Sequence, residues 1–210
     1  MLRIALLGDS IFDNAPYTQG GPAVIDHLRQ LLPSASAADL FAIDGSVVGD
    51  VSNQLRRVTS LHTHLVLSAG GNDALRNIGV LELEVSSSAE ALAHLSDVVD
   101  AFECDYRAML EECAGVGLPL VVCTIYEGWF EDPSYKKVTR TAIRAFNDAI
   151  IGGAAIKGLR IIELRRVCTS SEDYANPIEP SVIGGAKIAQ AILRAVQEDP
   201  AQFGGARVAA

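Results

Sequence analysis

The chain opens on Leu2-Arg3-Ile4-Ala5-Leu6-Leu7-Gly8-Asp9-Ser10, a short apolar run that ends in Gly-Asp-Ser. An apolar run of this length, closed by a turn residue, is typical of a buried strand in a parallel sheet. Ser10 would then lie just beyond the carboxyl end of that strand, where open α/β sheets bind their ligands. The stretch therefore predicts an α/β fold and makes Ser10 a candidate nucleophile.

The rest of the chain alternates between apolar runs and helical patterns. Further runs predict strands at residues 38–43, 65–69, 118–125 and 159–164, and residues 87–114, with neither glycine nor proline, predict a long amphipathic helix. We expect a flavodoxin-like, three-layer α/β/α sandwich with about five parallel strands in the order 2-1-3-4-5. One domain over residues 1–198 and a C-terminal tail over 199–210 are expected, with a long polar loop at 165–180.

Composition narrows the classes of function. The 210 residues carry a formal net charge of −9, which disfavours nucleic acid and anionic membranes as partners because both reward a basic surface. No apolar run approaches the roughly 20 residues of a membrane span, and no leader is recognisable, so a cytoplasmic location is expected. The four cysteines form no CxxC pair and have no neighbouring histidine, which predicts free thiols and no metal site.

Polar residues beside glycine follow three of the predicted strands. They are Gly8-Asp9-Ser10, the loop around Gly49, and Gly71-Asn72-Asp73. The carboxyl ends of parallel strands lie side by side, so these residues are expected to converge. Acyl transfer needs a nucleophile and donors aimed at the developing oxyanion. Ser10 would supply the nucleophilic Oγ, and the oxyanion donors would be the N–H groups of Ser10 and Gly49 with the Asn72 amide.

These three blocks resemble those of the SGNH (GDSL-type) hydrolases. Gly8-Asp9-Ser10 is similar to the nucleophile block, Gly49 to the glycine block, with Gly45 as its rival, and Gly71-Asn72-Asp73 to the Gly-Asn-Asp block. The resemblance spans the whole chain. It implies an esterase, thioesterase, lipase or deacetylase that needs no metal or organic cofactor, with Asp9 and Asp73 in supporting roles.

The fourth block departs from the family pattern. The family places Asp-x-x-His before the last helix, and this chain reads Asn176-Pro177-Ile178-Glu179, which aligns Asn176 with the aspartate and Glu179 with the histidine. A second register, with Asp173 and Asn176 in those places, breaks the spacing to Gly184. None of the histidines, at positions 27, 62, 64 and 94, lies in a loop expected to reach Ser10.

The double change has a chemical logic. A glutamate base accepts a proton from serine and can take a donor on its other oxygen, which an asparagine amide would supply. An ordinary glutamate, with a pKa of about 4.3, is a poor base for serine, but burial raises such a value. We therefore hypothesise a Ser10–Glu179 dyad oriented by Asn176. The alternative is that Glu179 has only a structural role, as a carboxylate that the helix dipole favours at the start of a helix.

The lead interpretation is a hydrolase of small carboxylic esters or thioesters. The alternative is a catalytically impaired protein that binds an acyl or carbohydrate ligand in the same cleft. A flavodoxin-like phosphate binder is disfavoured, since neither G-x-G-x-x-G nor a P-loop lysine follows the first strand. Arg76 is either an anion contact or a solvated helix charge, and the aromatic loop Tyr126–Phe130 either lines an acyl pocket or packs in the core.

Overall fold

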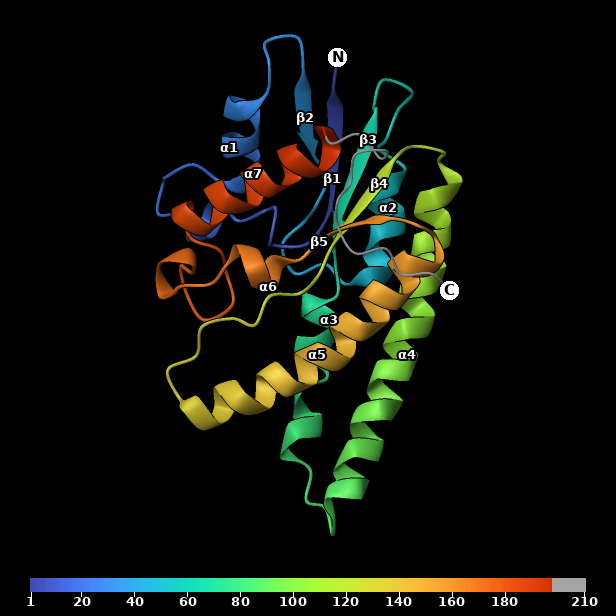
Figure 1. The fold of residues 1–210 in the computed structure, drawn as a ribbon, viewed down its shortest axis with the longest axis vertical. Helices are drawn as coiled ribbons and strands as arrows, with labels where there is room; N and C mark the ends of the chain where they lie inside the picture. Colours follow the sequence, from blue (N-terminus) through green and yellow to red (C-terminus); the bar gives the residue numbers. More distant parts are fainter. Residues whose placement is uncertain (198–210) are drawn as a thin grey trace.

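The predicted sheet is present in the computed structural model, which describes residues 1–197. Five parallel strands pair in the order β2-β1-β3-β4-β5 (Figure 1). Their bounds are β1 Arg3–Gly8, β2 Ala37–Leu40, β3 His64–Ser68, β4 Leu120–Cys123 and β5 Arg160–Ile162. The strand order confirms the sequence prediction. The expected tail, 199–210, lies outside the described residues.

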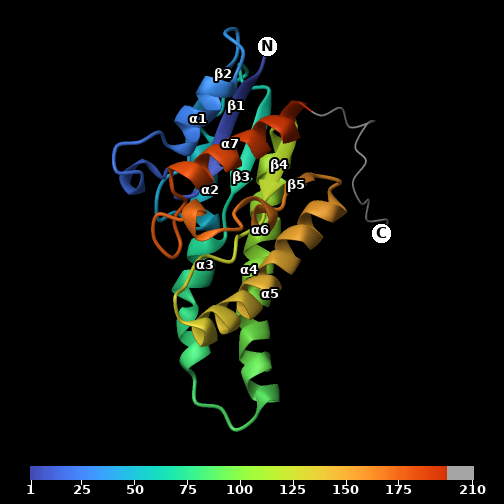
Figure 2. The ribbon, with the colours of Figure 1, turned by 60° about the vertical axis from the view of Figure 1, so that its left-hand side comes forward.

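Helices cover both faces of this sheet. One face carries α1 (Val24–Leu31) and α7 (Val182–Gln197), which pack against each other. The other carries α2 (Val51–Leu55), the long α4 (Ser88–Gly115) and α5 (Pro133–Ile156). Figures 1 and 2 show this three-layer arrangement from two directions. The long helix predicted over 87–114 therefore exists almost as expected.

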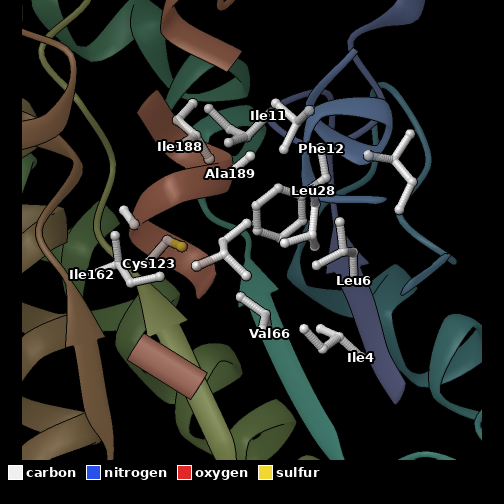
Figure 3. Packing of buried hydrophobic residues seen from close by; sticks show 14 of the residues in the cluster. Ile4, Leu6, Ile11, Phe12, Leu28, Val66, Cys123, Ile162, Ile188 and Ala189 are labelled. Carbon is white, nitrogen blue, oxygen red and sulfur yellow. The ribbon is translucent and has the colours of Figure 1, made fainter. Parts of the chain in front are cut away.

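Side-chain alternation along β1 divides the core between the two faces. Ile4 and Leu6 point to the α1 and α7 side, where they join a cluster with Phe12 and Ile188 (Figure 3). Ala5 and Leu7 point to the opposite cluster. All four of these β1 side chains are fully buried, because a central parallel strand is covered on both faces. This explains why the run reads as continuously apolar.

Several short elements at the carboxyl end of the sheet were not predicted. They are η1 (Ala15–Tyr17), η2 (Val48–Asp50), α3 (Gly71–Arg76), η3 (Ile78–Glu82), α6 (Leu164–Val167) and η4 (Ser171–Asp173). The last two correct the expectation of an unbroken polar loop at 165–180. Elements of three to six residues are too short to carry a hydrophobic period, so no pattern announces them.

Two further properties of the fold concern its cysteines and its helices. All four cysteines, each within the described part of the chain, are free thiols. Among residues 1–197, no helix is both long and apolar enough to cross a membrane.

Candidate active site

A tight turn at the end of β1 presents Ser10. Gly8 has a φ of +126°, and a Cβ at this position would lie 1.7 Å from the Ser68 carbonyl oxygen of β3. Only glycine fits there, since it lacks the Cβ and accepts a positive φ. The Asp9 N–H then donates to that same Ser68 carbonyl at 3.1 Å. The chain therefore leaves the sheet in one defined direction, and Ser10 follows at once.

Ser10 contacts the carboxylate that the sequence suggested as its base. The Ser10 Oγ–H donates to Glu179 Oε1 across 3.0 Å, although the residues are 169 positions apart. Both side chains are buried, Ser10 with 7% and Glu179 with 6% of its surface exposed. A candidate base must lie within hydrogen-bond reach of the proton it takes, and Glu179 meets that condition. The helix-start alternative does not account for this contact.

Burial tunes two carboxyl groups of the site. It raises the pKa of Glu179 to about 7, against the lowering effect of the Ser10 hydrogen bond and with a small addition from the charge of Asp44. Burial also raises the pKa of Asp9 to about 8, and nearby Glu179 and Asp73 add to the rise. Asp9 therefore stays largely protonated near neutral pH. Glu179 can then ionise beside a neutral neighbour rather than a second negative charge.

Asn176 does not hold the Glu179 carboxylate, which corrects the hypothesis from sequence. Its Oδ1 accepts the main-chain N–H groups of Ile178 and Glu179, both at 2.9 Å. Glu179 Oε2, which the Asn176 amide was expected to contact, is buried with no hydrogen-bond partner. Asparagine commonly caps its own turn in this way. Asn176 therefore shapes the loop that carries Glu179 and leaves the second carboxylate oxygen unoccupied.

Three hydrogen bonds that the sequence did not predict anchor that loop. The Tyr126 hydroxyl donates to the Ile178 carbonyl at 2.5 Å, and the main-chain N–H of Trp129 donates to the Pro177 carbonyl at 2.8 Å. The Asn14 amide donates to the Pro180 carbonyl at 3.1 Å. Every one of these bonds ends on a main-chain carbonyl, so no complementary residue type marks them in the sequence.

The Gly-Asn-Asp block and the Gly49 loop are joined by hydrogen bonds. The Asn72 amide donates to the Ser46 carbonyl at 2.9 Å. Asp73 accepts the Val48 N–H at 3.2 and 3.4 Å. The two predicted oxyanion blocks therefore meet at the sheet edge. Gly49 itself lies in η2, is exposed, and does not line the pocket that holds Ser10, so its place in an oxyanion hole stays a prediction.

Gln54 is a buried support that was also missed. Its Oε1 accepts the Gly8 N–H at 2.7 Å, and its Nε2 donates to the Gly8 carbonyl at 2.8 Å and the Ser46 hydroxyl at 3.2 Å. This one amide joins the end of β1 to the Gly49 loop. The sequence signal that could have revealed this role is a glutamine on the apolar side of a short helix, three residues after Val51.

The remaining candidates do not line the pocket that holds Ser10. Asp173, the candidate aspartate of the second register, accepts two main-chain N–H groups. It also forms an ion pair with Lys187 of α7 at 2.6 Å, so its carboxylate already has structural partners. Arg76 is exposed and outside the pocket lining. None of the four histidines, all within the described residues, lines the pocket. His62 instead contacts Asp39 at 3.1 Å.

A partly open pocket of about 100 Å³ lies at the reactive groups. Asp9, Ser10, Asn72 and Glu179 line it together with the aromatic loop, from which Tyr126 and Phe130 contribute. The candidate nucleophile Ser10, its carboxylate partner Glu179 and the amide of Asn72 thus share one cavity. No organic cofactor or metal is needed to connect these groups in an acyl-transfer scheme.

Comparisons with solved structures find the same architecture in several hydrolases. A lipase/acylhydrolase from Enterococcus faecalis is 19% identical, covers 92% of this chain and 94% of its own, and has a TM-score of 0.67. A phospholipase A1 from Streptomyces albidoflavus NA297 is 15% identical, with coverages of 92% and 98% and a TM-score of 0.68. The acetyl xylan esterase AlAXEase is 17% identical, with coverages of 93% and 100% and a TM-score of 0.67.

Sequence comparison assigns the family. No curated protein sequence matches significantly. The profile of the GDSL-like Lipase/Acylhydrolase family matches residues 6–182, which includes Ser10, the Gly-Asn-Asp block and Glu179. This match covers most of the chain, and the structural neighbours share its three-layer fold. The chain belongs to the GDSL-like lipase/acylhydrolase family.

Proposed function

We propose that this protein hydrolyses carboxylic esters or thioesters, with Ser10 as the nucleophile and Glu179 as the general base. The single observation that supports the proposal is the buried hydrogen bond from Ser10 Oγ to Glu179 Oε1, at 3.0 Å, inside the pocket. The raised pKa of Glu179, about 7, suits a general base at neutral pH.

The reaction follows from these positions. Glu179 takes the Ser10 hydroxyl proton as Oγ bonds to the acyl carbon, and the carbonyl electron pair moves onto oxygen. The Ser10 and Gly49 N–H groups and the Asn72 amide would stabilise that oxyanion. When the intermediate collapses, Glu179 returns the proton to the leaving alcohol or thiol, and an acyl-Ser10 ester remains. Water, deprotonated by Glu179, then releases the acid and restores Ser10.

Asp9 would influence this cycle through its protonation state. With a pKa of about 8, it is mostly neutral at pH 7, so it does not oppose the ionised Glu179. The oxyanion also forms beside a neutral carboxyl rather than an anion. Asp9 is thus a supporting group, held by the Ile11 N–H on its Oδ1 at 3.1 Å.

The structural neighbours leave the acyl group open. Their names include an acetyl xylan esterase and a phospholipase A1, which differ widely in the acyl group removed. We therefore infer the reaction class from the site of this chain, and the acyl group from the shape and polarity of its own pocket.

Hydrolysis of p-nitrophenyl esters tests the proposal. We expect wild-type turnover, its loss in Ser10→Ala, and a kcat/KM lower by roughly 100- to 10,000-fold in Glu179→Gln, which keeps the shape but not the base. Glu172→Gln, an exposed change in the same segment, is the matched control. Wild-type kcat/KM should rise with pH around pH 7, as Glu179 ionises.

Two outcomes would contradict the proposal. Full activity in Glu179→Gln would exclude Glu179 as the general base. Ser10 could still be the nucleophile of a hydrolase that uses another base. Absence of turnover on ester, thioester and acetyl-sugar substrates would favour the ligand-binding alternative.

A further inference from the structure

The pocket extends from Ser10 into a region walled by apolar side chains of four separate elements. Leu75 comes from α3, Ile78 and Leu81 from η3, Leu95 from α4, and Ile143 and Phe146 from α5. Figures 1 and 2 show η3 and the first half of α4 reaching beyond the carboxyl end of the sheet, beside α5. Most of the side chains that line the cavity with these reactive groups are therefore apolar.

Three polar side chains that line the pocket already have partners within the protein. The Thr139 hydroxyl donates to the Tyr135 carbonyl at 3.0 Å, and the Asn77 amide donates to the Asp73 carbonyl at 2.9 Å. Glu127 lies 3.8 Å from Arg144 in an ion pair. A sugar or a hydroxylated acyl group would bury hydroxyls there with few partners, which costs free energy. An unsubstituted alkyl chain has no hydroxyl to bury and does not incur this cost.

We infer that this pocket binds the acyl chain of the substrate and selects alkyl chains of about four to eight carbons over acetyl. The inference rests on the proposed function and names its substrate class. Its size argument is direct: an apolar cavity of roughly 150 Å³ holds benzene, so the pocket of about 100 Å³ holds roughly four carbons. Because it is partly open, a few further carbons continue along the walls.

A chain-length series measures the selection. Each buried methylene contributes about a fourfold gain in binding, so kcat/KM should rise roughly 15-fold from p-nitrophenyl acetate to butyrate. It should rise again to the hexanoate and then level off at the octanoate and dodecanoate. A profile that is flat, or highest at acetate, would overturn the inference while leaving the hydrolase intact.

A filled pocket gives the sharper test. Ala142 lines the pocket on α5, and Ala142→Leu places three extra carbons in it. We expect the ratio of kcat/KM for the hexanoate to kcat/KM for the acetate to fall at least about tenfold. Ala93→Leu is the matched control, since Ala93 is exposed on α4 and does not line the pocket. Equal hexanoate activity in both variants would contradict the inference.

Binding of the free acid separates this inference from the proposed function. Calorimetric titration with octanoate should give a Kd of about 1 mM or tighter for wild type and for Ser10→Ala, and weaker binding for Ala142→Leu. Thermal unfolding of each variant shows that it is folded. If no ester is turned over but octanoate binds in this pattern, the function fails and the acyl pocket stands. If octanoate does not bind, or binds equally to Ala142→Leu, the pocket assignment fails.

Discussion

Replacing Glu179 with glutamine should stabilise the protein in alkaline solution while removing its proposed base. Burial raises the pKa of Glu179 from its ordinary value of 4.5 to about 7. Between these two values the folded protein holds a proton that the unfolded chain has lost. Stability of the wild type therefore falls as pH rises through this window, and the full cost is present above it. The glutamine side chain of Glu179→Gln does not ionise, so the variant escapes the cost.

The magnitude follows from the two values. At about 1.36 kcal/mol per pKa unit, holding the ionised carboxylate costs about 3 kcal/mol at high pH. Some of that cost is already present at pH 5, so between pH 5 and pH 8 the variant should gain roughly 2.5 kcal/mol relative to wild type. Asp9 acts in the same direction, because removing the Glu179 charge lowers one cause of its own raised pKa.

Urea unfolding at pH 5 and pH 8 measures the effect, with the free energy of unfolding extrapolated for each protein. Glu172→Gln, an exposed change seven residues away, should alter stability by less than about 0.5 kcal/mol at both pH values. A Glu179→Gln difference that is the same at pH 5 and pH 8 would refute the reasoning, because the carboxylate would then ionise normally in the folded state. The test does not depend on finding a substrate.

Three further substitutions probe the frame of the site. Tyr126→Phe removes the hydroxyl that holds the Ile178 carbonyl, so kcat should fall several-fold at unchanged KM and stability by about 1 kcal/mol; an unchanged kcat would deny Tyr126 a positioning role. Gly8→Ala should cost at least about 3 kcal/mol, seen as a lost or strongly lowered thermal transition, because its Cβ would overlap the Ser68 carbonyl oxygen. Tyr106→Phe should leave the free energy of unfolding in urea unchanged or raise it by about 1 kcal/mol, since the buried Tyr106 hydroxyl has no hydrogen-bond partner. A clear loss of stability would contradict this and show that the hydroxyl is hydrogen-bonded.

The architecture was accessible from local patterns. The continuous apolar run of β1 reflects a strand covered on both faces, and the 3.6-residue period of α4 reflects a helix packed on one side. Parallel strands joined by right-handed crossovers then leave few possible orders, and 2-1-3-4-5 is the observed one. Gly8, Ser10 and Asn72 could be placed at the carboxyl edge because strand ends in such a sheet must meet there.

The chemistry of the site depended on contacts between distant parts of the chain. The spacing of the fourth block nominated Glu179, but only the folded structure shows its carboxylate 3.0 Å from Ser10 and buried enough to raise its pKa to about 7. The role of Asn176 was mistaken because an amide can cap a backbone turn or hold a side chain, and the residue type does not distinguish the two. The hydrogen bonds of Tyr126 and Gln54 were not foreseen, since they go to main-chain groups, which every residue has. The proposed acyl pocket forms only where α3, η3, α4 and α5 come together, so its apolar walls read locally as ordinary helix faces.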